Sequence, residues 1–179
     1  VLYLFNFMKI KVLLVDDHHL VRKGIRLLLE DTDDIEIVGE ASNGNEGLEK
    51  IKILSPDLVL IDISMPEMNG IEMVSKAKNK FPDTKLLILS MHNSEEYILQ
   101  SLEAGAHGYI LKDSTQEDML RAIRAVSKGD RFFSPSVTNL IINAYTNLNR
   151  QIQHQNDKKK TSLSEREKEI IRFLIDGLN

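Results

Sequence analysis

The sequence has no cysteine among its 179 residues and no long hydrophobic run. Without cysteine the chain cannot form a disulfide framework, a zinc ribbon or a thiol nucleophile, and a reducing compartment is permitted. Its apolar runs are far shorter than the ~20 residues of a membrane span, so we expect a cytoplasmic protein without a membrane segment. Residues 1–8 are apolar but lack a basic start and a small-residue cleavage site, and they do not predict a signal peptide.

Charge is distributed unevenly along the chain. Residues 1–149 carry 16 Lys and Arg against 22 Asp and Glu, whereas residues 150–179 carry 7 against 5. The larger part therefore does not favour a polyanion through its overall field, and the short tail is better suited to attract one. Because 42% of the residues are hydrophobic, we expect a sizeable core rather than a disordered chain.

Residues 10–130 alternate short apolar runs with segments of helical periodicity, of which the last begins with the capping-box spacing of Ser114 and Glu117. Unalternating runs of Val, Ile and Leu are typical of strands buried on both faces. The expected strands are Ile10–Val15, Ile35–Val38, Leu58–Ile61, Leu86–Leu89 and Tyr109–Leu111. No Gly-x-Gly-x-x-Gly follows the first run, which disfavours a dinucleotide-binding fold. We predict an α/β fold with a doubly wound five-stranded parallel sheet, for which the flavodoxin-like strand order is one of two common arrangements.

The pattern changes after residue 129. Ser134-Pro135 is typical of a helix start, and an amphipathic stripe follows it. The stripe consists of Val137, Leu140, Ile141, Ala144, Tyr145 and Leu148. Residues 150–160 are polar and predict a linker, after which Ser164 and Glu167 have the spacing of another capping box.

Polar residues follow four of the five predicted strands. Asp16 and Asp17 follow the first strand, Asp62 the third, Ser90 the fourth and Lys112 the fifth. Taken singly, the residues other than Asp62 have ordinary structural explanations, such as a helix N-cap or a solvated surface position. Asp62 differs, because it ends an apolar run and precedes a loop with Pro66 and Gly70 at turn positions. Because ligands bind beyond the carboxyl ends of the strands in an open parallel sheet, we expect the five side chains to converge on one edge. Three close carboxylates repel one another unless a cation lies among them, and Mg²⁺ fits a site with few protein ligands better than Ca²⁺ does.

Longer motifs surround these residues. They are Val15-Asp16-Asp17-His18, Leu60-Ile61-Asp62-Ile63-Ser64-Met65-Pro66, Met68-Asn69-Gly70, Leu89-Ser90-Met91-His92 and the run from Gly105 to Asp113. With them the chain resembles a two-component response regulator of the NarL/FixJ type. Leu163-Ser164-Glu165-Arg166-Glu167 and Asp176-Gly177-Leu178 resemble the start of a LuxR-type helix-turn-helix domain. The resemblance implies a flavodoxin-like receiver domain at 8–130, a linker helix and polar linker at 131–160, and a truncated all-α helix-turn-helix domain at 161–179.

The resemblance also implies a chemistry for the polar edge. Asp62 would accept a phosphoryl group from the phosphohistidine of a sensor histidine kinase. Asp17, Asp62 and the backbone carbonyl of Ser64 would hold Mg²⁺, and Asp16 would act on the ion largely through a bound water. The protein would then be a phosphorylation-gated transcription regulator rather than an enzyme.

A switch is implied as well. Lys112 would pair with the acyl phosphate, Ser90 would donate its hydroxyl to a phosphoryl oxygen, and Tyr109 would move between outward and inward positions. Ser64 and His92 occupy the positions that govern water access in this family. The other histidines, His18, His19, His107 and His154, are not spaced as metal ligands, and we expect none of them to be one.

Two other functions are less favoured. A phosphatase or phosphotransferase that uses an aspartyl phosphate usually carries a second Asp two residues after the nucleophile, where this chain has Ser64. A receiver-like module that is never phosphorylated is disfavoured because all the pocket residues are present.

DNA binding and dimerisation are predicted in less detail than the acidic pocket. The match to a helix-turn-helix ends before a recognition helix, so we do not expect this chain by itself to bind DNA specifically, although the full-length domain would. A homodimer is plausible on phosphorylation, through the fourth helix and fifth strand or through the helix at 135–150. Alternatively, that helix folds back on its own domain.

Overall fold

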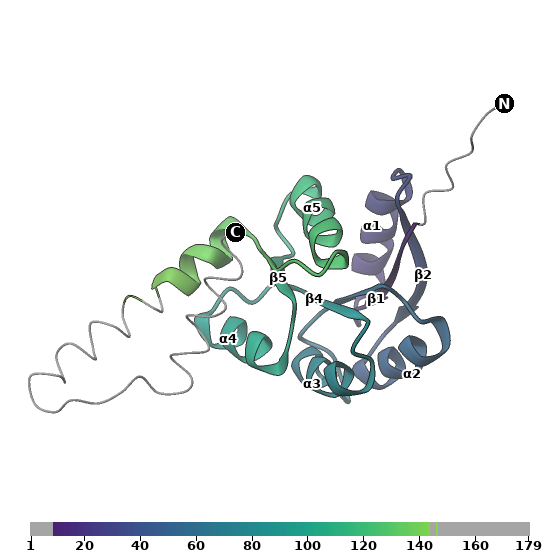
Figure 1. Ribbon diagram of the computed structural model, residues 1–179, viewed down its shortest axis with the longest axis horizontal. Coiled ribbons are helices and arrows are strands. Elements are labelled where there is room, and N and C mark those ends of the chain that lie inside the picture. Colours follow the sequence, from purple (N-terminus) through teal and green to yellow (C-terminus); the bar gives the residue numbers. More distant parts are fainter. Residues whose placement is uncertain (1–8, 144–145, 147–179) are drawn as a thin grey trace, which may run out of the picture.

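The computed structural model describes residues 9–143 and 146. Six strands form one parallel sheet in the order β2-β1-β3-β4-β5-β6, with helices on both faces (Figure 1). The elements are β1 (Ile10–Val15), α1 (His19–Glu30), β2 (Ile35–Ala41), α2 (Gly44–Leu54), β3 (Leu58–Ile61), α3 (Gly70–Lys80), β4 (Lys85–Ser90), α4 (Glu95–Ala104), β5 (Gly108–Leu111), α5 (Gln116–Ser127) and β6 (Phe132–Phe133). Within the described residues, no helix is long and apolar enough to cross a bilayer.

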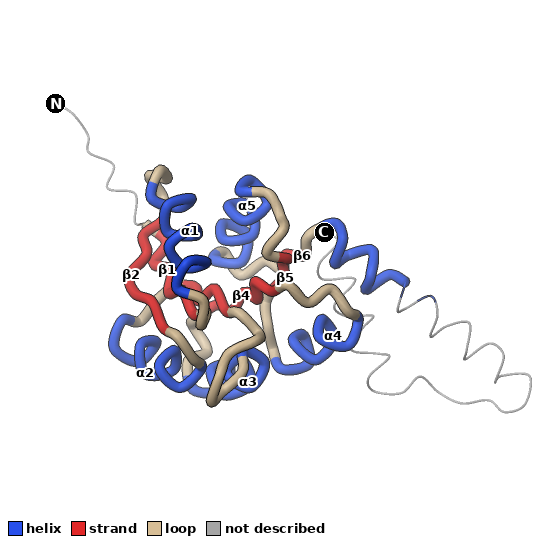
Figure 2. The backbone as a smooth tube through the Cα atoms, turned by 180° about the vertical axis from the view of Figure 1, so that it is seen from behind, coloured by secondary structure: helices blue, strands red, loops and turns tan. Residues whose placement is uncertain are grey.

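Each face of the sheet is covered by its own set of helices. Along β1, Leu13 and Val15 belong to one apolar cluster and Val12 and Leu14 to the other, because successive side chains of a strand point to opposite faces. Helices α2, α3 and α4 contribute to the first cluster and lie together on one side of the sheet, whereas α1 and α5 cover the other side (Figures 1 and 2). The doubly wound α/β prediction is therefore confirmed, and the five predicted strands are all present.

A sixth strand extends the predicted sheet. β6 consists of Phe132 and Phe133, which pair in parallel with Gly108 and Tyr109 of β5. A strand of two residues is too short to show a periodic hydrophobic pattern in the sequence. The prediction of five strands therefore missed β6.

The first turn of α5 differs from the prediction by one residue. Thr115 is the N-cap, and its side-chain oxygen accepts a hydrogen bond from the backbone N–H of Asp118. Ser114 instead lies in the preceding turn, where its N–H donates to the carbonyl of Leu111. The capping box predicted at Ser114 and Glu117 was wrong, because the neighbouring pair has the same hydroxyl-to-acid spacing.

The segment after β6 packs on the domain. Helical residues begin at Pro135, as Ser134-Pro135 predicted, and the N–H of Ser134 donates to the carbonyl of Tyr109. Val137 and Ile141 are buried in the same cluster as α4 and Tyr109. The helix thus folds back on its own domain as far as it is described. The predictions for Ala144, Tyr145, Leu148 and residues 150–179 lie outside the described residues.

His107 joins three strands at the amino-terminal edge of β5. Its Nδ1 accepts a hydrogen bond from the N–H of Leu86 (3.1 Å), its own N–H donates to the Leu86 carbonyl, and its carbonyl accepts from Phe132. Burial and the nearby cations of Lys85 and Arg131 lower the pKa of His107 to about 4. The neutral ring is therefore the form that the fold selects.

We expect His107 to make the folded protein less stable as the pH is lowered. A histidine whose pKa is lowered on folding contributes stability above its unfolded pKa of about 6.5, and this is lost as the pH falls towards 4. Between pH 7 and pH 5 the loss should be about 1–2 kcal/mol. Urea unfolding of the wild-type chain and of His107→Asn, which keeps an acceptor but does not titrate, measures it. An equal slope in both proteins over this range would contradict the assignment.

Candidate functional site

The strand order places two aspartates next to each other. Val15 of β1 is in register with Ile61 of β3, so the next residues, Asp16 and Asp62, leave the same edge of the sheet side by side. The N–H of Asp62 donates to the Val15 carbonyl (2.8 Å), which fixes this register. Both side chains are buried, with 5% and 4% of their surfaces exposed. The structure therefore brings together two of the side chains that were expected to converge at this edge.

Lys112 reaches both carboxylates from the end of β5. Its Nζ lies 2.7 Å from Asp16 Oδ2 and 3.0 Å from Asp62 Oδ2, and only 11% of its side chain is exposed. The N–H of Lys112 donates to the carbonyl of Ser90, which ties the ends of β4 and β5 together. One buried cation thus neutralises part of the charge of two buried anions.

The charges of this triad affect one another. Burial raises the pKa of the Asp62 carboxyl and the Asp16 carboxylate adds to the rise, although Lys112 opposes it. Burial would lower the pKa of Lys112, but its contacts with Asp16 and Asp62 outweigh that effect and raise the pKa. Lys112 is therefore held as a cation, while ionised Asp62 is destabilised by its surroundings.

The loop after β3 is folded tightly against Asp62. Asn69 caps α3 by accepting the N–H of Glu72, and the N–H of Gly70 donates to the carbonyl of Ile63. A Cβ on Gly70 would lie 2.1 Å from the carbonyl oxygen of Asp62, so no larger residue fits at this contact without moving the loop. The glycine thereby allows α3 to begin directly beside the acidic edge.

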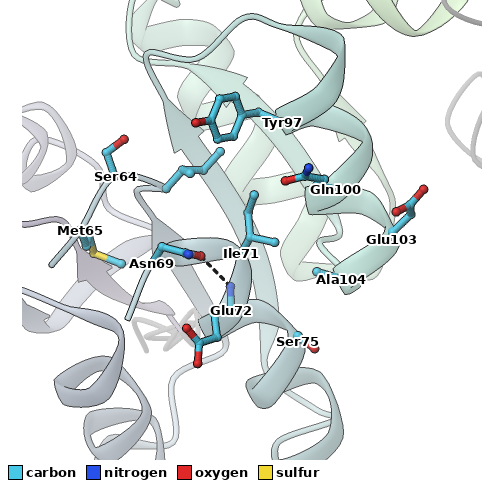
Figure 3. A pocket seen from close by; sticks show the side chains of 11 residues that line it. Ser64, Met65, Asn69, Ile71, Glu72, Ser75, Tyr97, Gln100, Glu103 and Ala104 are labelled. Atoms are coloured by element: carbon cyan, nitrogen blue, oxygen red, sulfur yellow. Dashed lines mark hydrogen bonds between the residues drawn. The ribbon is translucent and has the colours of Figure 1, made fainter. Parts of the chain in front are cut away.

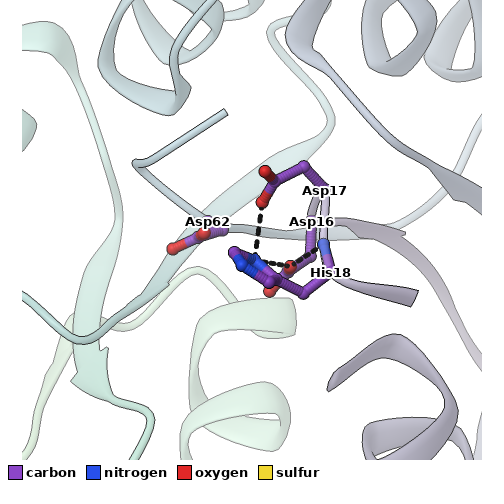
Figure 4. A group of neighbouring side chains, drawn as sticks. All are labelled: Asp16, Asp17, His18 and Asp62. Atoms are coloured by element: carbon purple, nitrogen blue, oxygen red, sulfur yellow. Dashed lines mark hydrogen bonds and ion pairs between the residues drawn. The ribbon is translucent and has the colours of Figure 1, made fainter. Parts of the chain in front are cut away.

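Asp17 and His18 complete the acidic cluster, which we define as Asp16, Asp17, His18 and Asp62 (Figure 4). Asp17 is more exposed than Asp16, and its Oδ1 lies 2.7 Å from His18 Nδ1. The backbone N–H of His18 donates to Asp16 Oδ1 (2.7 Å). His18 lies at the helix start, as expected, but the sequence prediction overlooked that its ring would be directed at the carboxylates.

The cluster fits a divalent cation. One ligand atom from each of its four residues lies within 4.8 Å of the others. Opposite ligands of an octahedral Mg²⁺ are about 4.2 Å apart, so the spacing allows several carboxylate oxygens to share one ion. Asp16 Oδ2 is buried without a well-directed hydrogen bond and contacts Lys112 alone among the described ion pairs, which leaves it able to face a second cation or its water. The carbonyl of Ser64 remains a predicted ligand.

Ser90, His92 and Tyr109 form a second group beside the cluster. The N–H of His92 donates to Ser90 Oγ (3.2 Å), and the Tyr109 hydroxyl donates to the His92 carbonyl (2.6 Å). Tyr109 is fully buried, and burial raises its pKa to about 12. The ring of His92 shares a hydrogen bond with Ser64 Oγ (2.7 Å) and stacks on Tyr97, which sequence reasoning missed.

A groove of about 640 Å³ lies between α3 and α4, next to Ser64 (Figure 3). Its walls include Ile71 of α3 and Tyr97 and Ala104 of α4. Tyr97 therefore both lines the groove and stacks on His92 of the second group.

Arg22 of α1 connects the edge to the rest of the domain. Its Nη1 donates to the backbone carbonyl of Asp16, and its Nε donates to Glu40 Oε2 (2.9 Å). Arg26 donates to the other oxygen of Glu40. Sequence reasoning missed Arg22, because a basic residue on an amphipathic helix is usually a solvated one.

Comparison with known proteins agrees with the predicted resemblance. Residues 12–124 match the family model of the response regulator receiver domain. The nitrate/nitrite response regulator protein NarL of Escherichia coli is 36% identical over 167 residues, which cover 93% of this chain and 76% of that protein. The oxygen regulatory protein NreC of Staphylococcus carnosus is 37% identical over 168 residues, which cover 93% and 77%. A solved two-component response regulator of the LuxR family from Aurantimonas has a TM-score of 0.73 and 31% identity over 77% of this chain and 99% of that one.

Replacing Asp62 by asparagine should stabilise the fold. A carboxyl whose pKa is raised on folding contributes stability at low pH that is lost as the pH rises, so ionised Asp62 opposes folding at neutral pH. Without divalent cations at pH 7.5, Asp62→Asn should raise the free energy of unfolding by on the order of 1 kcal/mol. Lys112 retains Asp16 as its partner in this variant.

Chemical denaturation measures this difference, with Asp83→Asn at an exposed aspartate as the control. The gain should shrink as the pH is lowered towards 4, because the wild-type carboxyl then becomes neutral too. A loss of stability in Asp62→Asn at pH 7.5 would show that the ion pair with Lys112 outweighs the burial of charge.

Proposed function

Because the chain belongs to the response regulator receiver domain family, we propose that its Asp62 accepts a phosphoryl group from a partner histidine kinase in a Mg²⁺-dependent step. The observation that carries the proposal is the convergence of Asp62 with Asp16, Asp17 and Lys112 at one edge of the sheet. One of the two relatives is named a response regulator and the other an oxygen regulatory protein, which agrees with a regulatory role.

The residues at the edge have separate tasks in this transfer. A carboxylate oxygen of Asp62 attacks the phosphorus, a P–O bond forms, and the P–N bond to the donor imidazole breaks. Phosphoryl transfer depends on positioning and on neutralising the equatorial oxygens, and Lys112 lies close enough to Asp62 to do so. Asp17, Asp62 and the Ser64 carbonyl are the proposed ligands of Mg²⁺, and Asp16 would act largely through a bound water. The ion would supply further positive charge at the phosphoryl oxygens.

Ser90 and Tyr109 are the proposed switch. Phosphorylation adds about −1.5 to −2 charges at Asp62. The Ser90 hydroxyl accepts from His92 and still has its own proton to donate to a phosphoryl oxygen. Because Tyr109 is bound to the carbonyl of the same His92, a shift of Ser90 would be transmitted to the loop that precedes α4.

Output to DNA is proposed for a full-length helix-turn-helix domain, whose predicted start at residue 161 lies outside the described residues, and it is not expected of this chain by itself. The tail sequence and the family support this assignment. Dimerisation on phosphorylation remains a proposal of the same kind.

Phosphorylation should be directly measurable. With Mg²⁺ and a small phosphodonor such as acetyl phosphate, the intact chain should gain the mass of one phosphoryl group. Asp62→Asn should gain none, because the accepting carboxylate is absent, whereas Asp83→Asn should behave as the wild type. Chelation of Mg²⁺ should suppress the gain. A wild-type chain that gains nothing at saturating donor would favour the unphosphorylated interaction module instead.

Arg22 should position the metal-binding loop. Arg22→Ala removes the hydrogen bond to the Asp16 carbonyl, whereas Arg26→Ala removes a comparable bond to Glu40 without touching Asp16. We expect Arg22→Ala to weaken Mg²⁺ binding about tenfold, in line with other residues that orient metal ligands. Calorimetric titration with MgCl₂ measures the affinity. Equal losses in the two variants would assign both arginines to stability rather than to the site.

A further inference from the structure

We propose that His18 is a fourth, nitrogen ligand of the acidic cluster, which raises the affinity of the site for Mn²⁺ and Zn²⁺ relative to that for Mg²⁺. The inference deepens the proposed magnesium-dependent function and rests on it. The geometry that carries it is the placement of an imidazole among Asp16, Asp17 and Asp62, with one ligand atom of each residue within 4.8 Å of the others (Figure 4).

The His18 side chain is not used for the helix that it precedes. His18 is the N-cap of α1, and its side chain makes no capping hydrogen bond. Its backbone N–H is bound to Asp16 Oδ1 (2.7 Å), which anchors the residue beside the carboxylates. The ring then turns towards Asp17, where Nδ1 lies 2.7 Å from Oδ1. Local structure therefore positions the ring at the cluster rather than over the helix.

The contact between His18 and Asp17 occupies a place that a metal can take. Nδ1 donates to the Asp17 carboxylate only in the tautomer that carries the ring proton on Nδ1. A cation between them would instead bind the lone pair of Nδ1 in a neutral ring that keeps its proton on Nε2. Asp16 Oδ2 is buried and pairs with Lys112 Nζ (2.7 Å), so the cluster also contains a buried acceptor that already attracts positive charge.

The identity of the fourth ligand determines which cations gain from it. Mg²⁺ is a hard ion that takes oxygen ligands, so it has little to gain from an imidazole. Mn²⁺ and Zn²⁺ accept imidazole nitrogen together with carboxylate oxygen, and affinity generally rises from Mn²⁺ to Zn²⁺ for such mixed sites. Because 65% of the His18 side chain is exposed, the ring can adjust to the bond lengths of either ion.

Titration of the full chain with MgCl₂, MnCl₂ and ZnCl₂ tests the inference. Wild type, His18→Ala and the neighbouring control His19→Ala are compared by calorimetry. We expect His18→Ala to lower the affinity for Mn²⁺ and Zn²⁺ by at least about tenfold while changing that for Mg²⁺ less than about twofold. His19→Ala should match the wild type, and Asp17→Asn should weaken the binding of all three ions.

A spectroscopic readout identifies the ligand independently of affinity. Pulsed electron paramagnetic resonance of bound Mn²⁺ should show coupling to an imidazole nitrogen in the wild type and lose it in His18→Ala. Unchanged affinities and an unchanged nitrogen signal in His18→Ala would overturn the inference, as would an equal loss for Mg²⁺. Failure of the wild type to bind Mg²⁺ at all would overturn the proposed function itself, which separates the two results.

Discussion

The contacts of the Lys112 ammonium with Asp16 and Asp62 are the interaction on which the polar edge depends. Two carboxylates buried side by side would each lose hydration and would repel each other. The strand order makes their proximity unavoidable, because β1 and β3 are neighbours in register. Lys112 comes from β5, on the far side of β4, and its long side chain spans that strand to reach them. Charge is thus balanced by residues that are distant in sequence but fixed by one sheet.

His92 is the residue through which the edge and α4 are connected. Its backbone N–H and carbonyl bind Ser90 and Tyr109, and its ring contacts Ser64 and Tyr97. Four contacts from one residue leave few ways for the loop to rearrange independently of the strands beneath it. The loop that contains His92 is therefore rigidly connected to the strands. If a change in local charge rearranges it, two discrete arrangements are favoured over a gradual movement.

Sequence reasoning succeeded where a strong period or a fixed topology decides the outcome. Buried parallel strands give continuous apolar runs, and adjacent strand ends meet whatever their side chains are, so Asp16, Asp62 and Lys112 could be placed together. It failed where the structure depends on the choice between two neighbouring residues or on the rotation of one side chain. Thr115 and its predecessor have equivalent acidic partners, and the choice between them depends on where the preceding turn closes. The directions of Arg22 and His18 depend on side-chain torsions that no period encodes.

The helix at residues 135–143 belongs to the same cooperatively folded unit as the sheet and its flanking helices. Val137 and Ile141 lie in the same core cluster as Tyr109, so the tyrosine of the proposed switch and the segment that leaves the sheet share one packed interior. Burying two such side chains is worth roughly 1.5–3 kcal/mol each. A fragment cut after Gly129 would lose that cover and expose the hydrocarbon beneath it. The packing around Tyr109 thus depends partly on residues beyond the sheet, and excision there would alter the surroundings of the tyrosine on which the proposed switch relies.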